Sequence, residues 1–192
     1  LEEPPERHLQ ALAGISLRKR VHLPDSGVTP LEAFDAVRNL VRQDDRLHVY
    51  SNFGSDDPDV FLDLVRYLVV ARGCRAVCFD HLSMVVSGDK QAEGERKTLD
   101  YLSTRLEMMA KELDFALIIV SHVNDEGKTR GSRNLTKVFD ITINAERDLQ
   151  HWDPVERRTI SLRVLFNRYS SVTGPAGKVI YCPISGCLEE VT

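Results

Sequence analysis

Apolar residues in this chain follow two alternating patterns along its length. Short continuous apolar runs are typical of strands buried in a parallel sheet. Longer segments repeat an apolar residue every three or four positions, which is typical of helices with one buried face. Because segments of the two kinds alternate, the pattern predicts parallel strands joined by helices. The predicted fold class is α/β, with a mostly parallel central sheet.

Four helices are predicted from this spacing and from the prolines near their starts. Proline suits the first turn of a helix, because an N–H group at that position would have no partner within the helix. The predicted helices run from Pro4-Pro5 to about Ala13, onward from Thr29-Pro30, onward from Asp57-Pro58, and from about Gly94 to Leu113.

Seven strands are predicted from the apolar runs and from the turn residues between them. We expect the last two to form a hairpin at the edge of the sheet, joined by a turn at Thr173-Gly174-Pro175. No internal repeat or linker interrupts the pattern, so residues 1–192 are predicted to be one domain. The predicted strands are Val21–Leu23, Leu47–Tyr50, Ala76–Phe79, Phe115–Val120, Ile141–Ala145, Ile160–Tyr169 and Lys178–Cys182.

The composition is that of an ordinary globular chain, with 42% hydrophobic and 28% charged residues. The net charge of -4 argues against nucleic-acid binding through bulk positive charge, although a local basic loop stays compatible with it. The apolar runs are too short to span a bilayer, so no membrane association is expected. The chain begins at Leu1 without a methionine, and we expect it to be a piece of a longer protein.

The four cysteines form no C-x-x-C pair and have apolar neighbours. We interpret them as reduced core residues of a protein in a reducing compartment, with a disulfide or a metal site as the alternatives. They are Cys74, Cys78, Cys182 and Cys187.

Asp80 directly follows the apolar run Ala76–Phe79. Open parallel sheets bind ligands beyond the carboxyl ends of their strands, so a carboxylate placed there faces the binding crevice. Many nucleotide hydrolases hold Mg²⁺ through such an aspartate, usually by way of water. The alternative is an aspartate that only caps the next element.

His122 stands in the same position after the run Phe115–Val120. If the two strands are neighbours, His122 lies near Asp80, since adjacent strands are ~4.8 Å apart. A polar residue there can contact a terminal phosphate; the alternative is a histidine bonded to backbone. The loop that follows can hold a sugar-phosphate backbone without reading bases, or it can be a solvated connection. Its candidate contacts are Asn124, Lys128, Arg130, Gly131 and Ser132.

Arg168 lies late in the predicted strand Ile160–Tyr169, among apolar residues. It is either an exposed edge residue or a cation directed at an anion, such as the phosphate of a neighbouring subunit. Glu2 stands just before a helix that starts with proline. It is either a base that polarises an attacking water or a carboxylate favoured by the helix dipole.

Four blocks of the chain, in their order and spacing, resemble the RecA-like helicase domain of hexameric replicative DNA helicases. The likeness extends to the bifunctional primase-helicases of bacteriophages and their mitochondrial relative. Leu1-Glu2-Glu3 is similar to the strand end with the catalytic glutamate, and Gly73 to Ser87 with Glu95-Arg96-Lys97 is similar to the Walker B strand and its helix. The phosphate sensor and DNA loop are similar to Val120-Ser121-His122 with Arg130-Gly131-Ser132. The arginine-finger strand is similar to Asn167-Arg168-Tyr169 with Thr173-Gly174.

The resemblance implies a RecA-like fold of three α/β/α layers. It also implies an ATP-dependent 5′–3′ DNA helicase motor of the replication fork, with ATP or dTTP and Mg²⁺ as cofactors. It implies Glu2 as general base, Asp80 as the carboxylate associated with Mg²⁺, and His122 as the γ-phosphate sensor. Arg168 would reach the nucleotide of the next subunit in a hexameric ring. Loss of the γ-phosphate would move His122 and the DNA-holding loop, and so pull the strand.

The same resemblance implies single-stranded DNA, a primase and a DNA polymerase as partners. The expected compartment is the cytoplasm, which is the host cytoplasm for a phage protein, or the mitochondrial matrix or nucleoid for an organellar one. Two other functions stay open from the residues alone. A RecA-like recombination ATPase would share the sheet and the loop, and a non-hydrolysing scaffold would use the fold only for protein contacts.

Three features depart from the family pattern. No segment matches the phosphate-cradling G-x-x-x-x-G-K-[ST] loop, since Gly174–Lys178 would need glycine where Val172 stands. We therefore expect the chain as given to bind ATP poorly and to be inactive without that upstream loop. Phe166 occupies the place of a lysine that many members carry two residues before the arginine finger. The connection from the sensor to the DNA loop is also short.

Overall fold

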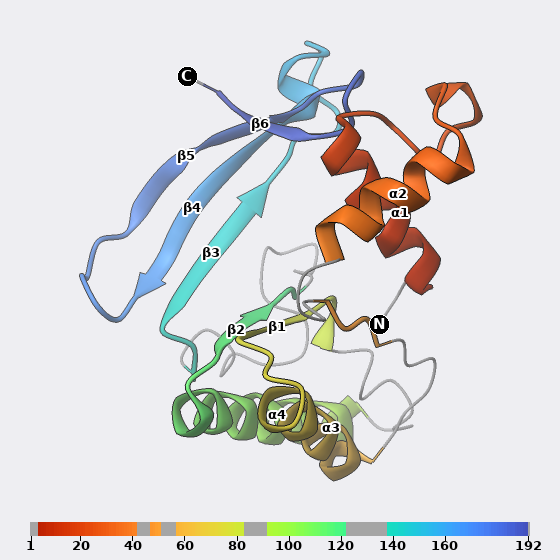
Figure 1. The fold of residues 1–192 in the computed structure, drawn as a ribbon. Coiled ribbons are helices and arrows are strands. Elements are labelled where there is room, and N and C mark those ends of the chain that lie inside the picture. Colours follow the sequence, from red (N-terminus) through yellow and green to blue (C-terminus); the bar gives the residue numbers. More distant parts are fainter. Residues whose placement is uncertain (1–3, 42–46, 51–56, 83–91, 122–137, 192) are drawn as a thin grey trace. The chain divides into compact units, whose positions relative to one another are not determined.

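The computed structural model describes residues 4–41, 47–50, 57–82, 92–121 and 138–191. The chain divides into two compact units. The first unit comprises residues 1–4 and 48–139, and the second comprises residues 5–47 and 140–192. Figure 1 shows the elements of both units along the chain.

The first unit is built on two parallel strands, β1 (Ala76–Phe79) and β2 (Ala116–Ile119). Helix α3 (Pro58–Val70) precedes β1, and helix α4 (Ala92–Leu113) connects β1 to β2. Parallel neighbours need a crossover connection of this kind, because a tight turn can only reverse the chain. Both helices lie on one face of the strand pair (Figure 1).

The buried core of this unit lies between the two helices and the strand pair. Phe61 of α3 packs on Phe79 of β1 with ring centroids 5.1 Å apart, which ties the helix layer to the strands. Tyr101 of α4 donates a hydrogen bond to Asp59 of α3 at 2.6 Å, so the two helices are also joined at their surface. The core side chains are Phe61, Leu62, Val65, Phe79, Leu82, Leu99, Leu102, Leu106, Met109 and Phe115.

The second unit pairs helices α1 (Pro5–Leu17) and α2 (Pro30–Val41) and contains a four-stranded antiparallel sheet. Its strands are β3 (Ile141–Glu146), β4 (Thr159–Asn167), β5 (Gly174–Tyr181) and β6 (Leu188–Glu190), hydrogen-bonded in that order. The short 3₁₀ helices Pro24–Ser26 and Glu156–Arg158 complete the unit's regular elements as far as the structure describes them.

Helix α2 begins with a reciprocal pair of contacts between Thr29 and Glu32. The Thr29 hydroxyl accepts from the Glu32 N–H at 3.2 Å, and the Glu32 carboxylate accepts from the Thr29 N–H at 2.7 Å. This is a capping box, which satisfies two N–H groups that a helix start otherwise leaves without partners. The backbone N–H of Thr29 and then its hydroxyl hold the pKa of Glu32 below its usual value.

All four predicted helices are present, and α1 extends to Leu17, beyond the predicted end near Ala13. The α4 face predicted from apolar spacing is buried at Leu99, Leu102, Leu106 and Met109. The long helix and the two parallel strands are therefore confirmed close to their predicted bounds.

Two predicted strands are wrong. Residues Val21–Leu23 form a turn, in which the N–H of Leu23 bonds to the carbonyl of Arg20 at 2.9 Å. Residues Leu47–Tyr50 have no regular structure. Both segments are short and apolar, but a strand needs a neighbouring strand to satisfy its backbone groups, and the described residues supply none at these places.

The predicted hairpin is confirmed as the β4–β5 pair, but its turn lies earlier than expected, and the pair forms the two inner strands of its sheet rather than the predicted edge. The connection is 168–173, and Gly174 and Pro175 already belong to β5. The described strands form a parallel pair and a larger antiparallel sheet rather than one mostly parallel sheet. The short connections 168–173 and 182–187 explain this, because chains that reverse so tightly can pair only in antiparallel fashion.

The four cysteines are free, as predicted, but they do not lie in the core. Cys78 is exposed, and Cys74, Cys182 and Cys187 are partly exposed. None of the helices in the described part of the chain is both long and apolar enough to cross a membrane. The expectation of a single domain over residues 1–192 stays a prediction.

Candidate functional site

Asp80 lies at the carboxyl end of the parallel strand pair. The register pairs Phe79 of β1 with Ile119 of β2, and the N–H of Val120 bonds to the carbonyl of Phe79 at 2.9 Å. The two strands are therefore neighbours, which was the condition for placing His122 near Asp80. Asp80 and Ser121, the residues that follow, leave the strands at the same edge of the sheet, where parallel sheets bind ligands. His122, the next residue, lies outside the described residues.

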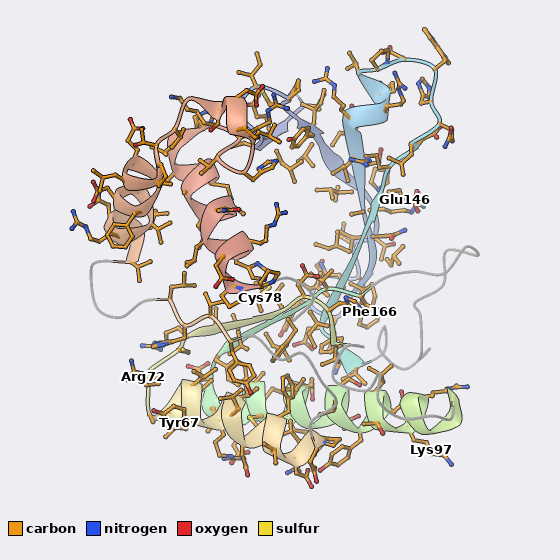
Figure 2. The ribbon with its side chains drawn as sticks, turned by 90° about the vertical axis from the view of Figure 1, so that its right-hand side faces the viewer. Tyr67, Arg72, Cys78, Lys97, Glu146 and Phe166 are labelled. Atoms are coloured by element: carbon orange, nitrogen blue, oxygen red, sulfur yellow. The ribbon has the colours of Figure 1, made fainter. Side chains whose placement is uncertain are left out.

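The carboxylate of Asp80 affects the thiol of Cys78, two residues earlier in β1. Desolvation of the thiol raises the pKa of Cys78, and the negative charge of Asp80 raises it further. Cys78 and Asp80 flank Phe79, whose side chain is buried against the helices. Since side chains alternate along a strand, Cys78 lies on the opposite face of the pair (Figure 2). Asp80 itself is exposed, so the carboxyl edge of the strand pair presents an acidic side chain.

The exposed carboxylate of Asp80 suits Mg²⁺ that arrives with a nucleotide. Within the described residues, no group of three or more His, Cys, Asp or Glu side chains could hold a metal ion. Mg²⁺ in nucleotide sites keeps several waters and takes one or two carboxylates together with phosphate oxygens, so a closed protein cage is not needed. A single exposed carboxylate at the strand end fits that coordination habit.

Arg168 lies in the second unit, in the turn after β4. The strand ends at Asn167, whose side-chain oxygen accepts from the N–H of Tyr169 at 3.1 Å and from the N–H of Ser170 at 3.3 Å. An asparagine that bonds to the backbone two residues on closes a turn locally, which is why the strand stops before Arg168. Arg168 was predicted inside the strand; it is instead the first residue of the exposed connection to β5.

Asp140 holds the guanidinium of Arg168. It precedes β3 and continues the register that pairs Ile141 with Asn167. Its carboxylate contacts Nε of Arg168 at 3.2 Å and accepts a hydrogen bond from the Tyr169 hydroxyl at 2.8 Å. Its backbone carbonyl accepts from the N–H of Arg168 at 2.8 Å. We call these three residues, Asp140, Arg168 and Tyr169, the arginine clamp.

Sequence reasoning missed Asp140 and Tyr169 as members of this site. Tyr169 is adjacent to Arg168 in the sequence, but the role of its hydroxyl follows only from the hydrogen bond that it donates to Asp140. Asp140 lies 28 residues before Arg168, and only the antiparallel register of β3 and β4 brings the two together. An acidic residue just before one strand and a basic residue just after its partner is the signal that could have indicated the pair.

Phe166 lies in β4, opposite Thr142 of β3, and is labelled in Figure 2. It stands where the resemblance implies a second cation. Its side chain is exposed, so this position presents an apolar group, and not a cation, at the surface of the sheet.

The structure describes two of the predicted site residues, and they fall in different units. Asp80 belongs to the first unit and Arg168 to the second. The others lie outside the described residues: Glu2, His122, Asn124, Lys128, Arg130, Gly131 and Ser132.

Comparison with known proteins defines the class of fold first. No protein-family profile matches the chain. Its fold is similar to that of a solved KaiC-like protein, PH0186 from Pyrococcus horikoshii OT3, with a TM-score of 0.53 at 12% identity. This likeness covers 71% of the present chain and 57% of the other. The predicted RecA-like α/β fold class is thereby confirmed.

A protein of similar sequence then indicates a more specific class than the fold does. The chain is 29% identical over 206 residues to a DNA helicase/primase of Enterobacteria phage T3. The alignment covers 98% of this chain and 36% of the phage protein, so the chain spans about a third of that relative's length. The resemblance to the RecA-like helicase domain of phage primase-helicases, predicted from the four sequence blocks, is confirmed.

Proposed function

We propose that this chain is a RecA-like ATPase motor domain of a replicative DNA helicase that moves 5′–3′ along single-stranded DNA. The observation that carries the proposal is the similarity to a phage helicase/primase over 98% of the chain. The parallel pair β1–β2 with Asp80 at its carboxyl edge supports it, because many nucleotide hydrolases hold Mg²⁺ with an aspartate at this place.

Asp80 is the proposed carboxylate for the Mg²⁺ that accompanies ATP or dTTP. It is exposed at the strand end, where it can hold water bound to the metal. When bound, Mg²⁺ supplies positive charge that offsets the charge developing on the transferred phosphoryl group. The chain's own contribution is to hold the anionic group fixed at the edge of the sheet.

Arg168 is the proposed arginine finger that reaches the nucleotide of a neighbouring subunit. An arginine supplied in this way is worth about 10³–10⁵ in the rate of hydrolysis. The arginine clamp supports the assignment, because it fixes a long, exposed side chain that would otherwise sample many rotamers. Asp140 contacts Nε, the guanidinium nitrogen nearest the backbone, and so orients the group from that nitrogen.

The remaining roles rest on the resemblance to the helicase family. Glu2 is the proposed general base, and His122 the proposed sensor of the γ-phosphate. The proposed contacts to single-stranded DNA are Asn124, Lys128, Arg130, Gly131 and Ser132. Each site needs two subunits, because the base and the metal carboxylate come from one and Arg168 from the next. A hexameric ring satisfies this requirement.

A test of the whole proposal uses the intact protein and a forked DNA substrate. Strand separation that depends on nucleotide hydrolysis and requires a free 5′ tail supports the helicase. Hydrolysis with filament formation on DNA but no strand separation would favour the recombination ATPase. Binding of protein partners without any hydrolysis would favour the scaffold. Asp80→Asn is the matched inactive control, because it removes the charge and keeps the shape of the side chain.

A further inference from the structure

Cys182 and Cys187 face one another across the turn between β5 and β6. The register pairs Ile180 with Glu189 and Tyr181 with Leu188, and the N–H of Cys182 bonds to the carbonyl of Cys187 at 2.9 Å. The two cysteines follow the last paired position, and the carbonyl of Cys182 accepts from the N–H of Gly186 at 2.8 Å, so Gly186 is an extra residue, a β-bulge, on the Cys187 side.

Their spacing is compatible with a disulfide. The backbone hydrogen bond from Cys182 to Cys187 places the two residues at neighbouring positions of the two chain segments, where Cα atoms lie about 5.5 Å apart, and disulfides join Cα atoms about 4.4–6.8 Å apart. Both sulfur atoms also contact the same residue of the turn. Sγ of Cys182 accepts from the N–H of Ser185 at 3.5 Å, and Sγ of Cys187 lies 3.7 Å from the Ser185 carbonyl, to which it donates.

The turn also activates one of the two thiols. The hydroxyl of Ser185 and then the backbone N–H groups of Ser185 and Ile184 lower the pKa of Cys182. Cys78 provides the contrast within the same chain, because desolvation and the charge of Asp80 raise its pKa. The thiolate is the reacting form of cysteine, so at neutral pH Cys182 is a better nucleophile than Cys78.

We propose that Cys182 and Cys187 form a dithiol site that undergoes thiol–disulfide exchange with low-molecular-weight disulfides such as glutathione disulfide. The Cys182 thiolate attacks one sulfur of the disulfide, the S–S bond breaks, and one thiolate leaves with the electron pair. Cys187 loses its proton to water, attacks Sγ of Cys182 and expels the second thiolate. The two cysteines are oxidised by two electrons, and one disulfide is reduced to two thiols.

The dithiol site is separate from the arginine clamp. Arg168 precedes the start of β5 and Cys182 follows its end, so the two lie at opposite ends of this strand. The exchange needs neither nucleotide nor DNA, and its test is therefore independent of the proposed helicase function.

The experiment treats the reduced 192-residue chain with glutathione disulfide and measures the mass of the intact protein and of its peptides over time. We expect the loss of two hydrogens, located between Cys182 and Cys187. In Cys187→Ser, the second step has no attacking thiol, so a glutathione adduct should accumulate on Cys182. In Cys182→Ser, the adduct should form much more slowly, and circular dichroism confirms that both variants keep their fold.

Two results would overturn the proposal. One is a stable glutathione adduct in the unaltered chain without an internal disulfide, since a paired thiol would resolve it. The other is oxidation that begins at Cys74 or Cys78 rather than at the turn. If either variant unfolds, the rates of alkylation at Cys182 and Cys78 in the unaltered chain decide the question. Faster alkylation at Cys78 contradicts the proposed site.

Discussion

Asp140 and Arg168 are joined through both their backbones and their side chains. The N–H of Arg168 bonds to the Asp140 carbonyl at 2.8 Å, and its Nε lies 3.2 Å from the Asp140 carboxylate. The other oxygen of this carboxylate accepts from Tyr169 at 2.8 Å. One oxygen of the Asp140 carboxylate is therefore bonded to Tyr169 and the other contacts Arg168, so the carboxylate fixes the direction in which the Arg168 side chain extends.

Arg168→Ala should abolish nucleotide hydrolysis in the intact protein while the ring still assembles. The loss follows from removing the cation that stabilises the transferred phosphoryl group, worth about 10³–10⁵ in rate. Steady-state hydrolysis measures the loss, and size-exclusion chromatography with light scattering measures assembly. Hydrolysis within a few-fold of the unaltered protein would remove Arg168 from the site.

Mixing two inactive variants tests whether Arg168 acts across subunits. Asp80→Asn subunits keep Arg168, and Arg168→Ala subunits keep Asp80. An interface that combines the intact residue of each should be active, so mixed rings should recover part of the hydrolysis. Mixing either variant with itself is the control. No recovery in rings shown to be mixed would argue that both residues serve the same subunit's nucleotide.

Asp140→Ala should lower kcat by up to about 10²-fold, because a misplacement of about 1 Å in a catalytic group can cost that much. KM should change less, since Asp140 positions Arg168 and does not touch the substrate. Tyr169→Phe removes only the hydroxyl and should have a smaller effect in the same direction. If Arg168→Ala is inactive but Asp140→Ala keeps full kcat, the clamp has no positioning role, and the assignment of Arg168 stands.

Lys128→Ala with Arg130→Ala should weaken binding of single-stranded DNA and spare hydrolysis in its absence. For single strands, removing one cation that neutralises a phosphate reduces the slope of log affinity against log salt by about 0.7. Fluorescence anisotropy at several salt concentrations measures both affinity and slope. Unchanged affinity and slope would take these two residues out of the DNA-binding surface.

The capping box at the start of α2 should make part of the stability depend on pH. The pKa of Glu32 is lower in the folded chain than its usual 4.5, so its carboxylate stabilises the fold above that pH. This contribution is lost as pH falls through the lower, folded-state pKa. Glu32→Gln should therefore lower the melting temperature at pH 7, and the difference should shrink in acid. If Glu32→Gln lowered the melting temperature equally at pH 7 and in acid, the contribution of Glu32 to the pH dependence of stability would be contradicted.

Leu102→Ala should destabilise the first unit by about 2–5 kcal/mol, because it empties a fully buried position in α4. Met108→Ala is the matched control on the same helix, since that side chain is 52% exposed. Exposed substitutions usually change stability by less than about 0.5 kcal/mol. Chemical denaturation compares the two, and equal losses would contradict the core assignment.

The helices and the two parallel strands could be predicted from the sequence because their signals are local. The apolar residues of α4 recur every three or four positions, and the run that ends at Asp80 has no polar interruption. The same rule failed at Val21–Leu23 and Leu47–Tyr50. An apolar run is a strand only when a partner supplies hydrogen bonds, and a short window contains no information about that partner.

The sequence alone determined the likeness to replicative helicases, the four helices and the acidic residue at the strand end, because these depend on residue order and local spacing. Only the tertiary structure decided that β1 and β2 are neighbours and that β3 to β6 form an antiparallel sheet. It also joined Asp140 to Arg168 and Cys182 to Cys187. These pairs depend on strand register, which arises from contacts between segments that the chain brings together only when it folds.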